Sequence, residues 1–227
     1  MRADWDVLAD RLLAGVRHDI NGRAAALSAI AHMTEMYAEA PSAEVLHQES
    51  RTLENIVGLL SLLQGDLDRD PEPMAVGEHL PRLVELSSRG RALDRVETLI
   101  DVDGMAPPIL VNWCLFFRSF LIVLDAVSNV ACDLGSKRVR VEYGPERDGL
   151  HLGVVALSAR TSEPDKDSGQ RETMGEKLVS VADALAGTEA SVSLRDSTTD
   201  LLAADFWFPS LSTARGRARL ADRVEAF

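Results

Sequence analysis

A histidine and an aspartate stand side by side in the middle of a long run of helix-forming residues. The segment reads Arg17-His18-Asp19-Ile20-Asn21-Gly22-Arg23. A neutral imidazole next to a carboxylate can act as a nucleophile, because one ring nitrogen attacks while the acceptor holds the other. His18 lies two positions from both Val16 and Ile20, so at about 100° per residue it points away from their apolar stripe. We therefore expect His18 to face water.

An ordinary solvated histidine fits the same position, and this alternative stays open for His18. The other histidines are interpreted in that way: His32, His47, His79 and His151. Inside a helix, Gly22 lowers the stability by about 1 kcal/mol relative to alanine. That cost is reasonable where another molecule approaches the backbone closely, although a kink explains it equally well.

Two helices must position this pair. From Asp4 to about Ala40, apolar residues recur at steps of three and four, as in a helix with one apolar face, and Pro41-Ser42 ends the pattern. The next helix has a heptad pattern, which is carried by Leu46, Leu53, Leu60 and Leu67 with Ile56 and Leu63 between them. Two antiparallel helices alone bury little of such surfaces. The sequence therefore predicts a helical hairpin over residues 1–68 that forms a four-helix bundle in a homodimer.

A charged segment with prolines, Asp66–Pro73, marks the boundary to a second domain over residues 74–210. The pattern there predicts helices at Val76–Arg89, about Pro108–Leu134 and Gly175–Leu185. It predicts strands at Arg95–Val102, Lys137–Tyr143, Leu150–Ser158, Ala190–Leu194 and Leu201–Pro209, with a turn at Gly144-Pro145. Helices interleaved with strands indicate an α+β sandwich. Residues 211–227 are expected to form an arginine-rich C-terminal tail.

Composition narrows the classes of partner. The 227 residues are 46% hydrophobic, which is enough for a real core, and the formal charge of −12 argues against nucleic acid as a partner. The N-terminus lacks the pattern of a secretory signal, and Cys114 and Cys132 lack the spacing of a metal or redox site. Ile109–Val127 is apolar but contains Arg118 and Asp125, so we expect a buried helix and no membrane. A cytoplasmic location is the expectation.

The segment RHDINGRAAALSAI resembles the H-box of two-component histidine kinases and related histidine phosphotransferases. In that family the histidine carries a phosphoryl group and the following acid assists its transfer, so the resemblance assigns these catalytic roles to His18 and Asp19. It also implies a surface for a partner protein around them, formed by Arg17, Asn21, Gly22 and Arg23. The sequence departs from the family at Gly22, usually Asn or Thr, and at Arg23, commonly proline.

The second domain resembles the GHKL-type ATPase domain of the same kinases. Asn129 stands in the place of the Mg²⁺-binding asparagine, with Asp125 one turn earlier, and Gly175 resembles the last glycine box. The aspartate that would bind adenine is missing from Ala156-Leu157-Ser158, and the expected phosphate loop contains few glycines. We expect a degenerate domain in which these residues are vestigial, with no cofactor and no metal.

Together these features favour a histidine phosphotransfer protein of a bacterial phosphorelay. It would shuttle a phosphoryl group between response-regulator receiver domains through His18 without hydrolysing ATP. Two alternatives stay open. One is an active histidine kinase with an atypical ATP and Mg²⁺ site, and the other is a non-catalytic kinase-like dimer that sequesters a regulator.

Overall fold

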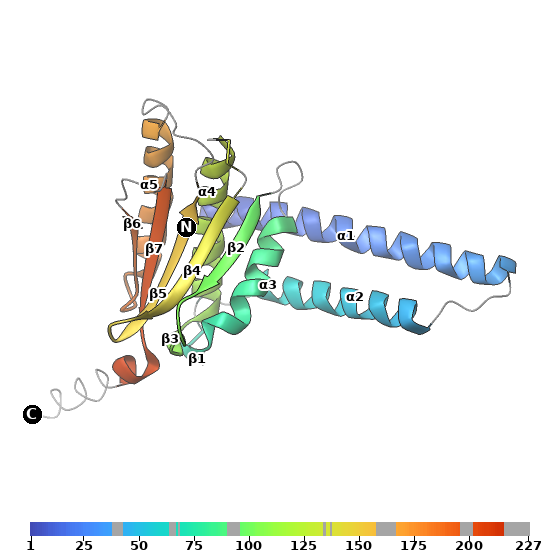
Figure 1. Cartoon of the computed structure of the whole chain (residues 1–227), viewed down its shortest axis with the longest axis horizontal. Coiled ribbons are helices and arrows are strands. Elements are labelled where there is room, and N and C mark those ends of the chain that lie inside the picture. The colour runs from blue at the N-terminus through green and yellow to red at the C-terminus, as the bar shows by residue number, and fades with distance from the viewer. Residues whose placement is uncertain are drawn as a thin grey trace, which may run out of the picture.

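The computed structural model of the chain describes residues 1–37, 43–63, 67, 69–89, 96–133, 135–136, 138–157, 167–195 and 202–215. Two long helices project from a body of helices packed on a sheet (Figure 1). The elements, in chain order, are α1 (Arg2–Tyr37), α2 (Ala43–Leu63), β1 (Glu72–Met74), α3 (Val76–Arg89), β2 (Glu97–Val102), β3 (Ile109–Val111), α4 (Trp113–Asp133), β4 (Arg138–Glu146), β5 (Gly149–Ala156), α5 (Asp167–Leu185), β6 (Ser191–Arg195) and β7 (Leu202–Pro209).

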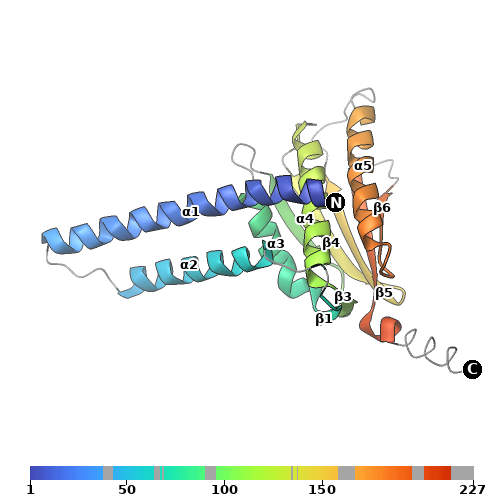
Figure 2. The same cartoon turned by 180° about the vertical axis from the view of Figure 1, so that it is seen from behind.

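One mixed sheet forms the centre of the body. Its strand order is β2-β4-β5-β7-β6, with β2 parallel to β4 and the other neighbours antiparallel. A separate antiparallel pair, β1 with β3, joins the linker to the body. Helices α4 and α5 both cover the same face of the five-stranded sheet (Figures 1 and 2). The mixed α+β architecture predicted from the sequence is confirmed.

The core lies between the sheet and helix α4. Leu150, Leu152 and Val154 of β5, which share one face of the strand, are fully buried, and so is Val155 on the other face. Helix α4 is buried along most of its length, and among the described helices it is the one long and apolar enough to span a membrane. Of its most apolar window, 83% is buried inside the fold, so this hydropathy reflects core packing.

The first half of α1 also belongs to this core. Trp5, Leu8, Leu12 and Val16, at steps of three and four, are all buried. The guanidinium of Arg118 from α4 lies 5.1 Å from the centre of the Trp5 ring, within the range of a cation–π contact. The C-terminal half of the helix extends away from the sheet and lies beside α2 (Figure 2). Helix α1 is therefore shared between the hairpin and the α/β body.

Several predicted boundaries are corrected by the structure. Strand β4 continues through Gly144-Pro145, and the reversal falls at Arg147-Asp148, where Arg147 takes a positive φ of 52°. Helix α5 begins at Asp167, eight residues before the predicted start at Gly175. Leu67, the last residue of the heptad pattern, lies in a turn beyond α2 and is 42% exposed.

The start of α4 is also later than predicted, because Asn112 caps it. The Asn112 side-chain oxygen accepts a hydrogen bond from the Leu115 amide at 3.0 Å, which satisfies a free N–H of the first turn. Its amide nitrogen donates to the carbonyls of Leu67 and Arg69 at 2.9 and 2.6 Å. One side chain thus begins the core helix and fixes the linker that precedes β1.

Candidate functional site

His18 lies near the middle of α1 and is 89% exposed, as its position opposite the apolar face predicts. The Nδ1 atom of its ring is 3.6 Å from Oδ1 of Asp19. That distance is too long for a hydrogen bond but places a negative charge beside one ring nitrogen. The other nitrogen, Nε2, is then the one available for chemistry.

The second oxygen of Asp19 is held by the α/β body. Arg89, the last residue of α3, forms an ion pair with Oδ2 of Asp19 through Nη1. Its Nη2 atom donates to Glu85 at 2.6 Å, and the Arg89 side chain is only 17% exposed. Each oxygen of the Asp19 carboxylate therefore faces a different partner, a histidine on the hairpin and an arginine on the body.

The residues predicted to contact a partner protein divide into two groups. Arg17, Asn21 and Gly22 are exposed, and a Cβ atom on Gly22 would meet nothing within 4 Å. Arg23 is half-buried, and its Nη1 atom donates to Glu49 of α2 at 2.9 Å. Arg23 therefore links the two helices of the hairpin, whereas the other three leave the surface around His18 open.

The predicted nucleotide residues of α4 are engaged with each other and with α1. The Asn129 amide donates to Oδ2 of Asp125 at 3.1 Å, and Arg11 of α1 donates to the same oxygen at 2.7 Å. Asp125 is buried, and the Arg11 side chain is 43% exposed. The charge of the Asp125 carboxylate is thus compensated by a side chain of the first helix.

Gly175 does not lie in a loop. It lies inside α5, where the backbone N–H bonds to the helix itself and cannot cradle a phosphate. A hollow of about 240 Å³ near Lys177 of the same helix is also lined by Asp4, Val7 and Arg11 of α1 and by Asp125 of α4. Sites for small molecules usually enclose roughly 300–1,000 Å³, so α1 leaves little room for a nucleotide here.

These residues do not form a site for Mg²⁺. The ion needs several oxygen ligands in octahedral geometry, whereas Asn129 offers one amide oxygen and the Asp125 carboxylate is paired with Arg11. Within the described part of the chain, no group of three or more His, Cys, Asp or Glu side chains is arranged to hold a metal ion.

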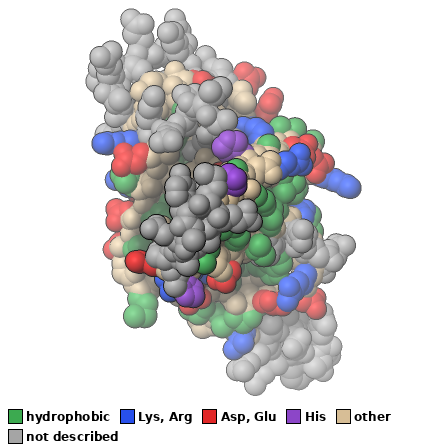
Figure 3. All heavy atoms as spheres, turned by 90° about the vertical axis from the view of Figure 1, so that its right-hand side faces the viewer, with side chains coloured by type: hydrophobic (Ala, Val, Ile, Leu, Met, Phe, Trp, Pro, Cys, Tyr) green, Lys and Arg blue, Asp and Glu red, His purple; other side chains and the backbone are tan. Residues whose placement is uncertain are grey.

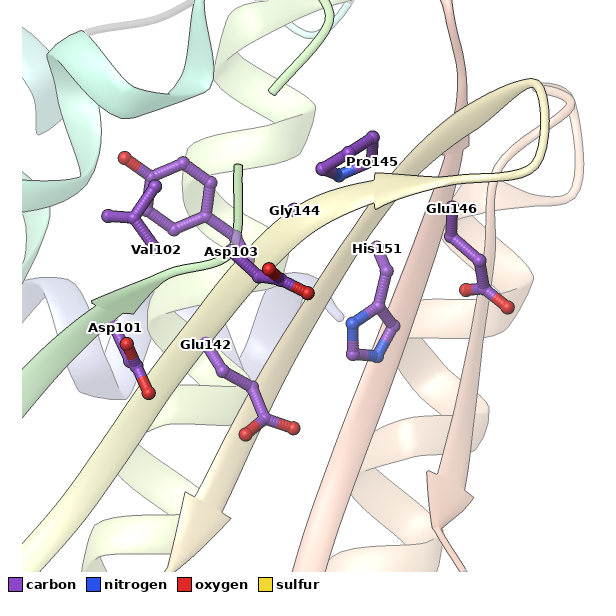
Figure 4. A pocket seen from close by; sticks show the side chains of 9 residues that line it. Asp101, Val102, Asp103, Glu142, Gly144, Pro145, Glu146 and His151 are labelled. Atoms are coloured by element: carbon purple, nitrogen blue, oxygen red, sulfur yellow. The ribbon is translucent and has the colours of Figure 1, made fainter. Parts of the chain in front are cut away.

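A larger hollow, about 630 Å³, lies over strands β2, β4 and β5 (Figure 4). Four of its nine lining residues are acidic, namely Asp101, Asp103, Glu142 and Glu146, and they lie around His151. The negative charge of this surface disfavours phosphates, so it does not replace the missing nucleotide site.

His151 belongs to a charged network on the same sheet. It lies 2.9 Å from Asp205, which also accepts hydrogen bonds from Arg195. The hydrogen bond to Asp205 raises the pKa of His151 even though burial opposes the charged form. Burial alone would raise the pKa of Asp205, but the hydrogen bonds from His151 and Arg195 outweigh it and lower that pKa to about 2.

Sequence reasoning missed Arg89 and Arg11 and left His151 as an ordinary solvated residue. Arg89 is 70 residues from Asp19 and Arg11 is 114 residues from Asp125, so no local spacing signals either pair. Pairing of β5 with β7 brings His151 next to Asp205 and Trp207, and the sequence alone does not indicate which strands pair.

Comparison with known proteins finds similar chains among solved structures. No protein-family model and no curated protein matches the chain. Among solved structures it is similar to the Acinetobacter baumannii histidine kinase AdeS, with 10% identity and a TM-score of 0.42 over 86% of this chain and 98% of that one. It is similar to the ATP-binding domain of PrrB from Mycobacterium tuberculosis, with 16% identity and a TM-score of 0.41 over 63% and 98%. The histidine kinase ThkA in complex with the response regulator TrrA gives 8% identity and a TM-score of 0.44 over 87% and 60%.

The solved structures named here are histidine kinases or parts of them, and all three TM-scores lie below 0.5. The sequence predicts a phosphotransfer protein that shuttles a phosphoryl group without ATP, and this prediction is at odds with these structures, which are histidine kinases. The shuttle hypothesis is therefore given up.

Proposed function

We propose that the chain is a two-component histidine kinase with an atypical nucleotide site and that His18 is its phosphoacceptor. The observation that carries the proposal is the exposed imidazole with Nδ1 beside the Asp19 carboxylate, on a helix that is packed against a kinase-like body. ATP enters as the substrate that donates the phosphoryl group. We propose the cytoplasm as its location.

The chemistry of His18 follows from this geometry. Asp19 favours the tautomer with the proton on Nδ1, so Nε2 carries the lone pair. Nε2 attacks the terminal phosphorus, the P–O bond to ADP breaks, and the electron pair leaves with the ADP oxygen. The ring keeps its Nδ1 proton and becomes positively charged, and the neighbouring carboxylate stabilises that charge.

The closed contact between α1 and α4 is the atypical part of the site. Arg11 pairs with Asp125 and α1 narrows the hollow next to Lys177, so nucleotide binding requires the first turns of α1 to separate from α4. We therefore propose that the described arrangement is a resting state of the kinase.

The partner in this proposal is the receiver domain of a response regulator. Arg17, Asn21 and Gly22 leave an exposed surface around His18. Figure 3, which views the molecule from the side on which the hairpin projects, shows hydrophobic, histidine and charged side chains together on this side. The similar structure of ThkA with TrrA agrees with such a partner.

We further propose a homodimer through the hairpin. Val57 of α2 is 64% exposed, and Val45 and Leu46 of the same helix are 40% and 44% exposed. A second copy that forms a four-helix bundle would bury them. Val57→Asp should then halve the mass in analytical ultracentrifugation, whereas equal masses for both proteins would argue against this interface.

The test of kinase activity is labelling with [γ-³²P]ATP and Mg²⁺. We expect an acid-labile, base-stable label on the wild type that is lost in His18→Ala. His32→Ala is the matched control, because His32 is an exposed histidine of the same helix, and it should keep the label. Absence of label on the wild type, or equal label on His18→Ala, would disprove the proposal.

One observation favours a second candidate, a non-catalytic kinase-like dimer that sequesters a regulator. The engagement of Asp125 with Arg11 and Asn129 leaves the predicted nucleotide residues occupied. This candidate requires a flat calorimetric titration with Mg²⁺ and ATP and the same binding of a receiver domain by wild type and His18→Ala. An ATP binding isotherm would rule it out.

A further inference from the structure

The acidic neighbour of His18 does not hold its position unaided. Adjacent residues of a helix point about 100° apart, so side chains at i and i+1 do not face each other. A free Asp19 carboxylate would rotate among its rotamers in water, and only part of that population would lie beside the imidazole. Its Oδ1 atom nevertheless lies 3.6 Å from Nδ1 of His18.

The α/β body supplies what holds it. Arg89 pairs with the opposite oxygen, Oδ2, from the end of α3, and the Arg89 head is itself fixed by Glu85 at 2.6 Å. The Arg89 side chain is 17% exposed and so is largely shielded from water, whereas the side chain of Asp19 is 37% exposed and that of His18 is 89% exposed. A shielded, doubly held guanidinium is a rigid support for a carboxylate, because its planar fork loses little rotamer freedom on binding.

We propose that Arg89 is a positioning residue for the phosphoacceptor. By holding Oδ2 of Asp19 it keeps Oδ1 against Nδ1 of His18, and so maintains the tautomer in which Nε2 is the nucleophile. It acts only through Asp19 and does not touch the reacting atoms. The inference rests on the proposed role of His18 but not on ATP as the donor.

The experiment uses potassium phosphoramidate, a small donor that needs no nucleotide site. Nε2 attacks its phosphorus as the P–N bond breaks, and the already protonated nitrogen leaves as ammonia with the electron pair of that bond. The rate of His18 labelling is measured on the full chain for the wild type, Asp19→Asn, Arg89→Ala, Arg89→Lys and the double variant Asp19→Asn/Arg89→Ala. Arg82→Ala is the matched control, since Arg82 is an exposed arginine of α3.

We expect Arg89→Ala and Asp19→Asn each to slow labelling about tenfold, less than the roughly 100-fold that loss of a general acid or base costs, because Asp19 orients the ring and does not itself transfer the proton. The double variant should be no slower than Asp19→Asn alone. Arg89→Lys should recover part of the rate, because an ammonium can still hold one carboxylate oxygen. Arg82→Ala should label at the wild-type rate.

A merely structural role for Arg89 would give a different pattern. The double variant would then label more slowly than Asp19→Asn alone. The thermal unfolding temperature of Arg89→Ala would also fall, and Arg89→Lys would not recover the labelling rate. Wild-type rates for Arg89→Ala, or no labelling of the wild type by phosphoramidate, would also overturn the inference. Labelling by phosphoramidate without labelling by ATP would instead refute the kinase proposal and leave the role of Arg89 supported.

Discussion

The ion pair between Arg11 and Asp125 should lose different amounts of stability depending on which of its two residues is replaced. Arg11→Met keeps most of the apolar stem but removes the guanidinium that compensates Asp125, whose side chain is 6% exposed. Removing one partner of a fully buried pair costs about 3–5 kcal/mol, and an exposed pair contributes about 0–1 kcal/mol. Arg11 is 43% exposed and Asn129 still donates to the carboxylate at 3.1 Å, so we expect an intermediate loss of about 1–3 kcal/mol.

The reverse substitution, Asp125→Asn, should cost less, about 1 kcal/mol or below, because it leaves a neutral buried amide and lets the half-exposed Arg11 reach water. The double variant should lose less than the sum of the two. The assay is urea unfolding followed by tryptophan fluorescence, at one fixed protein concentration because self-association would shift the midpoint. Equal losses in the two single variants, or additivity within about 0.5 kcal/mol, would refute the reasoning.

Three further predictions concern the body of the protein. Leu12→Ala should cost about 2–5 kcal/mol in urea unfolding, since Leu12 is 1% exposed, whereas Leu13→Ala, at a site 39% exposed, should cost less than about 1 kcal/mol. The pKa of His151 is raised in the folded protein, so the stability that its charged form contributes is fully present below pH 6.5 and is lost as pH rises through the folded pKa. The wild type should therefore exceed His151→Gln in urea midpoint by more at pH 5.5 than at pH 8.5. Gly149→Ala should lower the free energy of unfolding by roughly 1–3 kcal/mol, because the added Cβ would overlap the Phe208 carbonyl oxygen in the paired strand. An unchanged urea midpoint would contradict this.

The sequence predicts those features that local periodicity determines. Helix Val76–Arg89 is found with the predicted bounds, and the exposure of His18 follows from its angle to Val16 and Ile20. Strand β4 shows where local reasoning fails. Gly144-Pro145 is a turn signal by composition, but pairing with β5 carries the strand three residues beyond the predicted end at Tyr143 before the chain reverses.

The contact between Asp19 and Arg89 could not be predicted from the sequence, because it joins two helices whose relative position no local pattern determines. Asp19 and Arg89 are predicted separately, as the neighbour of a histidine and as the end of a helix, and nothing in either pattern indicates that they meet. Their contact depends on the angle at which the hairpin leaves the body. That angle is set by the packing of Trp5, Leu8 and Leu12 against the core, which becomes visible only in three dimensions.

The two ion pairs that join α1 to the body can be separated by experiment. Arg11 and Asp19 are eight residues apart, which is about 12 Å along a helix, and they meet different helices, α4 and α3. Only Asp19 touches the imidazole, so Arg11→Met should leave labelling of His18 by phosphoramidate unchanged. The same substitution releases Asp125 and Asn129, so under the kinase proposal it should raise labelling by ATP. If Arg11→Met slowed both reactions alike, the loss of the Arg11 contact would have shifted the whole of α1 relative to the body. The environment of His18 would then depend on the position of the helix and not on Arg89 alone.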